Sequence, residues 1–574
     1  MLGIVWMLAL ALSPTASASP LTTLRHDGGA VVRDDPYLPA ASEPARGPVG
    51  AGRAGSRAAA SAAGRTGSRA AASAAAPGLA RLRGSAAATA RAPKRTVRSE
   101  LARMLAAGAI DQATHDARLA TYAGARRFLR RLRGARRAAM GAVITNLDQI
   151  AARGDLDATR LPELFETVAR NREWWSRGPL LSYGSRVSFE GSPLVWQYYT
   201  GEGLQIQWLG TFGKANALWT SRTHDEDLRT LLDAAIGLAA QRAGGIAFEY
   251  LFDFDGGHPP WVSGLAQGTA VQALSRAAVR LGEPRFFQSA RAALGVFREA
   301  PPAGVRANTP VGAHYLIYSF APSLRVLNAF TQAVNGLHDF ALLANDVEGR
   351  ALFAAGEAQL RAELGAYDTG AWSRYSLQRE ADLSYHKLAR DFLENLCTRL
   401  EEDAARPAAA PAGAPAAGAP PAGAPVTGAP PAGAPATGAP PTGGALPGSP
   451  APPSVQPVLA DPTPYCAAAT RFTSYLRQPP VVALASRRAR AGKRAVLKLT
   501  LSKPAYVKLA VVRGGRTVAV LNARLGSGRR ALVWSRPRTA GEYTVMLRAT
   551  DLAGNVGSAR GELEVLRAAR KKKR

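Results

Sequence analysis

Apolar residues recur at helical spacing along most of the chain between residues 97 and 476. One helix opens near residue 97, and the same periodicity predicts helices over residues 122–151, 161–175, 228–243, 266–281, 286–297, 324–345, 350–364, 385–400 and 465–476. Many of these helices follow one another as pairs, and the loops between them carry candidate functional residues. Serial helical hairpins of this kind are typical of an α/α toroid.

Two parts of the chain alternate apolar and polar residues instead. Between residues 180 and 219, Val187 and Phe189 alternate with polar neighbours, as do Leu204, Ile206 and Trp208, which predicts strands and turns. Residues 479–566 contain about seven such strands, which indicates a β-sandwich of immunoglobulin or fibronectin type. The expected fold class is therefore multidomain and mainly α, with a small β region before the toroid and a β-sandwich after it.

Composition divides the chain further. An apolar run and then Ala16, Ser17 and Ala18 resemble a secretory signal, although no Lys or Arg precedes the run. We therefore expect a secreted or envelope-associated protein. The expected organisation is a signal peptide (1–18), a disordered Ala/Arg-rich segment (19–96), a helical N-terminal region (97–178), the β region and toroid (179–406), a Gly-Ala-Pro linker inserted into the toroid (407–458), the last toroid helix (459–478), the β-sandwich (479–566) and a basic tail (567–574).

The formal net charge of +30 points to anionic partners. Much of the excess lies between Arg53 and Arg137 and in the tail, so the basic termini are expected to contact anionic envelope polymers. No aromatic-rich basic motif or zinc spacing accompanies either run, which argues against specific nucleic-acid recognition. The seven histidines form no ligand-spaced cluster, so no metal site is predicted. The two cysteines, Cys397 and Cys466, are most simply a disulfide in an oxidising compartment.

Aromatic and amide side chains are frequent in the strand region. Flat rings such as Trp196 and Trp208 suit pyranose faces, and amides such as Gln197 and Gln205 suit sugar hydroxyls. The alternative is an ordinary aromatic core under a small sheet.

The helix over 385–400 offers a second candidate site. Asp382 and Ser384 are both good N-cap residues, so Tyr385 and His386 fall in the first turn. A helix N-terminus favours an anionic ligand. Tyr375 lies ten residues upstream in an expected loop, and two phenols beside a carboxylate cradle suggest proton transfer on an acidic substrate. The alternative is that both tyrosines are packing aromatics.

Several stretches carry a family resemblance. They are GLAQGTAVQALSRA (264–277), YSFAPSLRVLNAFTQAVNGLHDF (318–340), YDTGAWSRYSL (367–377), SYH (384–386) and RFTSYL (471–476). In order and spacing, residues 261–476 resemble the C-terminal catalytic domain of the D-glucuronyl C5-epimerases, which convert glucuronate to iduronate in heparan-type polymers. The linker and the β-sandwich lie outside the resemblance.

The resemblance implies which residues react. It matches Tyr318, Tyr375 and Tyr385 to three tyrosines around the reacting carbon, and we expect Tyr385 and Tyr318 to exchange the C5 proton while Tyr375 positions the substrate. Because that proton is α to a carboxylate, the reaction needs an acid and a base on opposite ring faces and no cofactor. The residues expected to bind the substrate are Arg374, Arg379, His386, Gln267 and Trp261.

The chain departs from the family pattern at three positions. Ile317 stands where the family has an acidic residue, Ser384 replaces another acidic residue, and Ala389 replaces a histidine. The residues considered as substitutes for the lost carboxylate are Glu249, Asp253 and Asp255, with His314 ranked below them.

The sequence therefore favours an exported uronyl C5-epimerase acting on an acidic polysaccharide. Two alternatives stay open: a polysaccharide lyase, because the same C5 carbanion can expel the C4 oxygen, and a catalytically silent glycan-binding envelope protein. Toroids of this kind are often dimeric, so a homodimer is among the expected assemblies.

Overall fold

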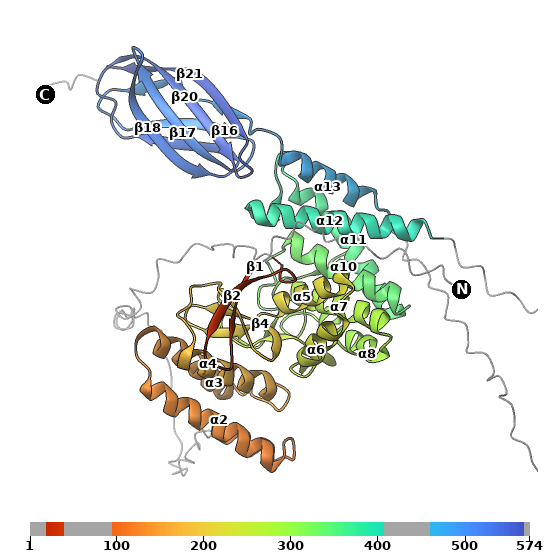
Figure 1. Cartoon of the computed structure of the whole chain (residues 1–574). Helices are drawn as coiled ribbons and strands as arrows, with labels where there is room; N and C mark the ends of the chain where they lie inside the picture. Colours follow the sequence, from red (N-terminus) through yellow and green to blue (C-terminus); the bar gives the residue numbers. More distant parts are fainter. Residues whose placement is uncertain (1–18, 40–94, 407–459, 568–574) are drawn as a thin grey trace, which may run out of the picture.

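The computed structural model describes residues 19–39, 95–406 and 460–567 (Figure 1). The predicted signal peptide, residues 40–94 of the predicted disordered segment, the whole predicted linker and most of the basic tail lie outside the described residues. Among the residues described, no helix combines the length and the apolar character needed to cross a membrane.

The N-terminal part packs four helices against a five-stranded sheet. The helices are α1 (Val97–Ala106), α2 (Gln112–Arg131), α3 (Gly134–Arg153) and α4 (Leu161–Arg177), so the predicted helix over 122–151 is two helices that break at Leu132 and Arg133. The sheet has the order β2-β1-β3-β4-β5, from β1 (Ser19–Leu24), β2 (Ala30–Asp35), β3 (Arg186–Phe189), β4 (Ser192–Tyr199) and β5 (Gly203–Ile206).

Within the predicted disordered segment 19–96, the first two strands correct the prediction for residues 19–39. Strand β1 pairs in parallel with β3, and β2 pairs antiparallel with β1. Leu21, Leu24 and Leu38 are buried, which gives this short segment enough apolar contact to order it. The prediction failed because the contacts are made with a strand more than 150 residues away.

The strand pattern predicted up to residue 219 ends earlier. Residues from Trp208 form α5 (Trp208–Ser221), which begins where the side chain of Gln207 accepts a hydrogen bond from the Gly210 N–H (2.8 Å). The predicted helix over 228–243 also ends early, as α6 (Asp225–Ile236), and is followed by the hairpin β6 (Ala240–Arg242) and β7 (Gly245–Ala247).

The centre of the molecule is a set of packed helices. They are α7 (Gly264–Leu281), α8 (Pro284–Ala292), α9 (Gly295–Arg298), α10 (Leu327–Leu343), α11 (Val347–Glu363), α12 (Leu383–Ala404) and α13 (Thr463–Tyr475). Helices α7 and α10 approach closely because Gly268 faces Ala333 and Gly336. A disulfide between Cys397 and Cys466 joins α12 to α13, which is the pairing expected from the cysteine count.

Short strand pairs lie between these helices and carry the loops of the site. They are β8 (Glu249–Tyr250) with β9 (Trp261–Val262), β10 (Arg306–Asn308) with β11 (Ala313–Tyr315), and β12 (Arg374–Ser376) with β13 (Arg379–Glu380).

The C-terminal module is built from two sheets that share one core. One sheet has the order β14-β16-β19, from β14 (Val482–Leu484), β16 (Ala495–Leu501) and β19 (Gly528–Trp534). The other has the order β15-β21-β20-β17-β18, from β15 (Arg488–Arg490), β17 (Ala505–Arg513), β18 (Arg516–Leu525), β20 (Gly541–Asp551) and β21 (Val556–Leu566). Buried and exposed residues alternate along β16, β17 and β20, as the sequence pattern predicts.

This module is docked on the helical region beside α12 and α13 (Figure 1). The buried ammonium of Lys503 donates to the carbonyls of Tyr475 and Gln478 (both 2.7 Å) and pairs with Asp551 (3.2 Å). Asn555 donates to the carbonyl of Leu476 (2.9 Å). The last residue of α13 and the residues just after it therefore form the contact with the module.

Candidate active site

The structure brings Tyr318, Tyr375 and Tyr385 together. Tyr318 follows β11, Tyr375 lies in β12 and Tyr385 lies in the first turn of α12, and all three contribute to one apolar cluster with Leu265 and Ile317. The ring centroids of Tyr375 and Tyr385 are 4.6 Å apart. Three segments that are distant in sequence thus place three phenols at one point.

Tyr318 is held by other aromatic rings. Its ring stacks on Phe320 (5.1 Å between centroids) and meets Trp261 (5.4 Å) and Phe254 (5.7 Å) edge to face. Burial raises the pKa of the Tyr318 phenol well above its usual value, and the neighbouring phenols of Tyr375 and Tyr385 add to this. Tyr318 is therefore protonated at neutral pH.

Tyr375 lies beneath a cationic side chain. The guanidinium of Arg379 is 4.5 Å from the centre of its ring, across the tight β12–β13 hairpin. Burial raises the pKa of Tyr375, the neighbouring phenol of Tyr385 adds to this, and the charge of Arg379 opposes it. Arg374 is partly exposed in β12 and Arg379 is exposed, so both predicted substrate-binding arginines are open to solvent, and Arg379 is the one in contact with a site tyrosine.

Tyr385 is positioned by the predicted helix cap. The Asp382 carboxylate accepts a hydrogen bond from the Tyr385 N–H (2.9 Å), and the helix begins at the next residue, Leu383. This places the phenol at the partially positive end of α12, where negative charge is stabilised.

His386 is a positioning residue, which corrects the prediction that it binds substrate. It is fully buried against Trp372, whose ring stacks on it at 3.8 Å. Its Nδ1 accepts a hydrogen bond from the N–H of Ser373, so Nε2 carries the proton and donates to the carbonyl of Phe472 (3.0 Å). With both nitrogens occupied, His386 ties the Tyr375 hairpin to α13.

Gln267 and Trp261 are corrected in the same way. Gln267 is buried, and its amide accepts from the Phe248 N–H and donates to the carbonyls of Ile246 (3.2 Å) and Ala293 (3.0 Å). Trp261 is also buried, and its Nε1 donates to the carbonyl of Phe252 (2.8 Å). Neither side chain has a free polar group to offer a sugar; both support the loop behind Tyr318.

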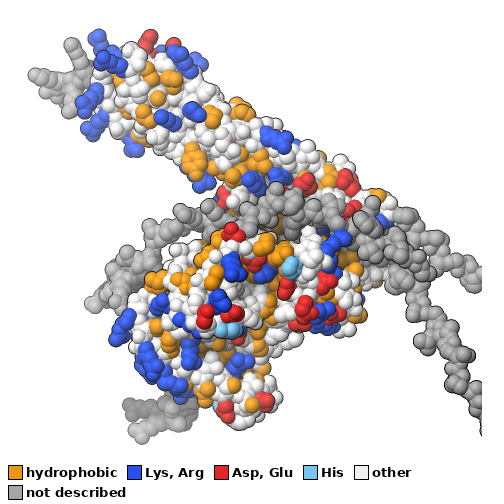
Figure 2. All heavy atoms as spheres, viewed as in Figure 1, with side chains coloured by type: hydrophobic (Ala, Val, Ile, Leu, Met, Phe, Trp, Pro, Cys, Tyr) orange, Lys and Arg blue, Asp and Glu red, His pale blue; other side chains and the backbone are white. Residues whose placement is uncertain are grey.

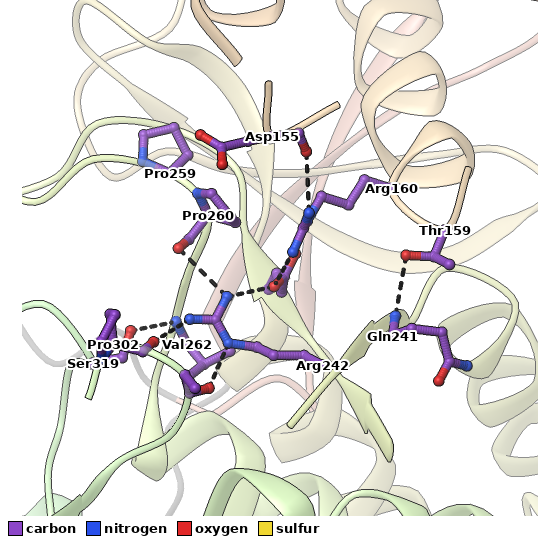
Figure 3. Close-up of polar contacts among 12 residues, drawn as sticks. Asp155, Thr159, Arg160, Gln241, Arg242, Pro259, Pro260, Val262, Pro302 and Ser319 are labelled. Atoms are coloured by element: carbon purple, nitrogen blue, oxygen red, sulfur yellow. Dashed lines mark hydrogen bonds and ion pairs between the residues drawn. The ribbon is translucent and has the colours of Figure 1, made fainter. Parts of the chain in front are cut away.

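A buried charge cluster fixes the β6–β9 region (Figure 3). The carboxylate of Glu249 is fully buried, accepts from Arg160 at 2.6 and 3.0 Å, and also pairs with Arg242 at 2.5 Å. Arg242 reaches the carbonyl of Ala303 as well (2.6 Å). Glu249 is thus committed to two cations and does not replace the carboxylate missing at Ile317.

The two aspartates of the aromatic loop differ. Asp253 pairs with His258 (3.0 Å) at the surface. Asp255, with a left-handed φ of 47°, lies within electrostatic reach of the tyrosines, since its charge helps to raise the pKa of Tyr375 and of Tyr183. His314 is buried and hydrogen-bonded to Glu363 (2.6 Å), and burial lowers its pKa. Of the four residues considered as substitutes, Asp255 is therefore the one whose charge acts on Tyr375.

The aromatic residues of the strand region belong mostly to the core. Trp196 and Trp208 are fully buried, and Tyr199 is nearly so. Tyr183 is the exception: it is 47% exposed, and partial burial raises its pKa, with a smaller contribution from the neighbouring phenol of Tyr385. Sequence reasoning missed Tyr183, because nothing in its local pattern separates an exposed aromatic residue near the site from the buried ones around it.

One side-chain group in the described part of the chain has metal-ligand spacing. It consists of Cys397, Glu401 and Cys466. The two sulfurs of this group are already joined to each other as a disulfide.

Comparisons with known proteins match the part of the chain that contains these tyrosines. Residues 243–406 match the family described as the D-glucuronyl C5-epimerase C-terminus. A D-glucuronyl C5-epimerase from Caenorhabditis elegans is 31% identical over 145 residues, which are 23% of this chain and 24% of that protein. The chain thus aligns with about a quarter of the length of that curated relative.

Similarity to solved structures is slight. An endo-beta-1,4-glucanase, CMCax from Acetobacter xylinum, is 13% identical and covers 34% of this chain and 67% of its own, with a TM-score of 0.23. CopC from Methylosinus trichosporium OB3b is 17% identical and covers 16% of this chain and 97% of its own, with a TM-score of 0.14. Tyr318, Tyr375 and Tyr385 all lie within residues 243–406, the segment that matches the D-glucuronyl C5-epimerase C-terminal family.

Proposed function

We propose that the protein is an exported, cofactor-independent uronyl C5-epimerase that acts on an acidic polysaccharide. The observation that carries this proposal is the meeting of Tyr318, Tyr375 and Tyr385 in a segment that matches the epimerase family. The disulfide between Cys397 and Cys466 supports export, because such bonds persist in oxidising compartments.

The reaction needs one group to remove the C5 proton and another to return it on the opposite ring face. Burial keeps Tyr318 protonated, which suits it to deliver a proton. Tyr385 lies at the positive end of α12, which suits it to accept one as a phenolate. Tyr375, which contacts Tyr385, positions the sugar between them, and the reverse reaction exchanges the two roles.

The substrate carboxylate becomes more negative as the C5 proton leaves, so a cation must face it. Arg379, which covers the ring of Tyr375, supplies that charge, and Arg374 in the same hairpin adds to it. The exposed ring of Tyr183 offers a flat surface to a neighbouring sugar, and Asp255 provides the carboxylate that Ile317 lacks.

The same proposal extends to architecture. Consecutive helices pack as α7 with α8, α10 with α11 and α12 with α13, and this pairing supports an α/α toroid around the site. The two sheets of the C-terminal module support an immunoglobulin- or fibronectin-like fold.

Deuterium exchange at C5 tests the proposed function. The protein is incubated with a glucuronate-containing polymer in deuterated water, and NMR follows deuterium at C5 together with iduronate formation. We expect exchange in the native protein and a loss of at least about 100-fold in Tyr318→Phe and Tyr385→Phe. The matched control is Tyr543→Phe, in which a hydroxyl bonded to the carbonyl of Thr539 is removed far from the site.

The other outcomes identify the alternatives. Exchange with 4,5-unsaturated chain ends, detected by ultraviolet absorbance, would mean a lyase. Polymer binding without exchange, in both the native protein and the variants, would mean a glycan-binding protein and would refute the epimerase.

A further inference from the structure

The C-terminal module exposes a basic sheet face that the proposed reaction does not use. We define the basic sheet face as the outward side chains of β17, β18, β20 and β21 in the half of the five-stranded sheet nearest the helical region. They are Tyr506, Lys508, Asn522, Arg524, Arg548 and Arg560. In Figure 2, basic side chains outnumber acidic ones over the module.

Strand register places these side chains in adjacent rows. Tyr506 lies opposite Arg524, whose guanidinium is 5.7 Å from the ring centre, and the ring remains 54% exposed. In the next row Lys508 lies opposite both Asn522 and Arg548. Directly opposed like charges destabilise a sheet, so the Lys508–Arg548 pair has an energetic cost. An anionic ligand would offset it.

The acidic side chains of the outer face lie at one end of the sheet. Glu542, Glu562 and Glu564 are at the end remote from the helical region, where Arg488 pairs with Glu564 (3.2 Å) and Arg490 is also exposed. The end that carries the basic sheet face is the end that contacts the helical region. An anionic chain is therefore attracted to the half of the sheet that adjoins the candidate active site.

The end of the sheet that carries the basic sheet face also contacts the β12–β13 hairpin, which contains Tyr375. The β18–β19 turn donates the Ser527 N–H to the carboxylate of Glu380 (3.0 Å) in β13. Glu380 follows Arg379, which covers the ring of Tyr375, and Ser527 lies three residues after Arg524. The Ser527–Glu380 contact thus places the hairpin that carries Arg379 beside the end of the sheet that carries Arg524.

We propose that the basic sheet face binds an acidic polysaccharide and holds it while another sugar of the same chain occupies the candidate active site. The arginines and Lys508 bind carboxylates, Asn522 binds hydroxyls and Tyr506 stacks on a sugar ring. The identification of this polymer as the substrate rests on the proposed function. The binding of an acidic polysaccharide to the sheet does not depend on it.

Binding by the full-length protein tests the proposal. The double variant Lys508→Glu with Arg548→Glu is compared with Lys498→Glu with Arg494→Glu, which makes the same change in net charge at exposed positions of β16 and the turn before it. We expect affinity for a glucuronate-containing polymer, measured by calorimetry, to fall at least about tenfold in the first variant and to change less than about twofold in the second. Equal losses in both variants would overturn the proposal.

A second variant separates sugar recognition from charge. Tyr506→Ala should weaken polymer binding several-fold and leave binding of inorganic polyphosphate unchanged, because only the sugar stacks on the ring. Loss of both ligands, or tighter binding of double-stranded DNA than of the polymer at the same salt concentration, would refute an acidic-polysaccharide site.

The failure of this inference can be told from failure of the proposed function. In the Lys508→Glu, Arg548→Glu variant we expect KM to rise for long polymer, with C5 exchange on a short oligosaccharide unchanged. If the native protein shows no C5 exchange but the basic sheet face still binds polymer, the inference holds and the epimerase proposal fails.

Discussion

Individual side chains around the tyrosines have roles that depend on what each one contacts. Asp253 and Asp255 are two residues apart in the same loop, yet Asp253 pairs with His258, whereas the charge of Asp255 acts on Tyr375 and Tyr183. Spacing alone does not distinguish two such aspartates.

This difference gives a matched pair of variants. We predict that Asp255→Asn lowers the rate of C5 exchange by about 100-fold, because it removes the carboxylate beside the phenols. Asp253→Asn, which removes the same charge two residues away, should retain most of the rate. The rate is measured by NMR in deuterated water, and an equal loss in the two variants would contradict the role given to Asp255.

The buried His386 gives the protein a defined response to acid. Burial lowers its pKa from 6.5 to about 4, so between these values the unfolded chain binds a proton that the folded chain excludes. Stability from this residue is therefore complete above pH 6.5 and is lost as the pH falls toward 4. The full loss is about 3 kcal/mol.

We predict that His386→Gln flattens the decline in unfolding free energy between pH 6.5 and 4, measured by urea denaturation. His258→Gln alters a histidine whose side chain is 71% exposed, and it should keep the native profile. A His386→Gln protein with the native pH dependence would show that this histidine does not control the acid response.

At the scale of elements, close helix packing positions the site. The candidate site lies between the loops that lead into α7 and α10, and these helices touch through backbone. A Cβ on Gly336 would lie 2.0 Å from the carbonyl oxygen of Gly268, which cannot move without shifting α7. A glycine is required at this crossing because no side chain fits there.

We predict that Gly336→Ala lowers the unfolding free energy by about 3 kcal/mol or prevents folding. Gly141→Ala makes the same chemical change inside α3, where the nearest atom would be a Leu129 methyl at 3.7 Å, and it should stabilise the protein by about 0.5–1 kcal/mol. Thermal unfolding of the two variants measures the difference, and equal effects would argue against the close crossing.

At the scale of the whole molecule, the C-terminal module and the helical region share a buried contact. Lys503 is 1% exposed, pairs with Asp551 and lies 5.5 Å from the ring centre of Trp372, which in turn stacks on His386. The Lys503 ammonium therefore connects the module, through Trp372, to His386, which follows Tyr385 in α12.

We predict that Lys503→Met destabilises the protein by about 3–5 kcal/mol, because it leaves the buried Asp551 carboxylate without its cation. Lys508→Met removes an exposed lysine from the same module and should change stability by less than about 0.5 kcal/mol. Calorimetric unfolding distinguishes them. A Lys503→Met protein as stable as the native one would show that the contact does not hold the module.

The disulfide constrains the same part of the molecule. It closes a loop with a sequence separation of 69 residues, so its loss in Cys397→Ser with Cys466→Ser should lower the unfolding free energy by about 4 kcal/mol. Denaturation of the native protein with and without reductant provides an independent measurement, and an unchanged midpoint in both experiments would contradict the prediction.

Much of this protein was predictable because its signals are local. The helices of the central region, the cap at Asp382 and the alternating strands of the C-terminal module follow from residue spacing, since each periodic pattern is set by neighbours within a few positions. The family stretches around Tyr318, Tyr375 and Tyr385 likewise named the candidate site, and the structure places these residues together.

The tertiary structure decided what depends on distant partners. The sequence did not reveal that β1 pairs with β3, that Arg160 and Arg242 both neutralise Glu249, or that His386 is enclosed by Trp372 and α13. Burial and ion pairing arise from segments that meet only in the folded chain, so no local pattern encodes them. The residue types of the site could therefore be predicted from the sequence. Packing in the folded chain decided whether each side chain is accessible to a ligand or bonded to a neighbouring residue.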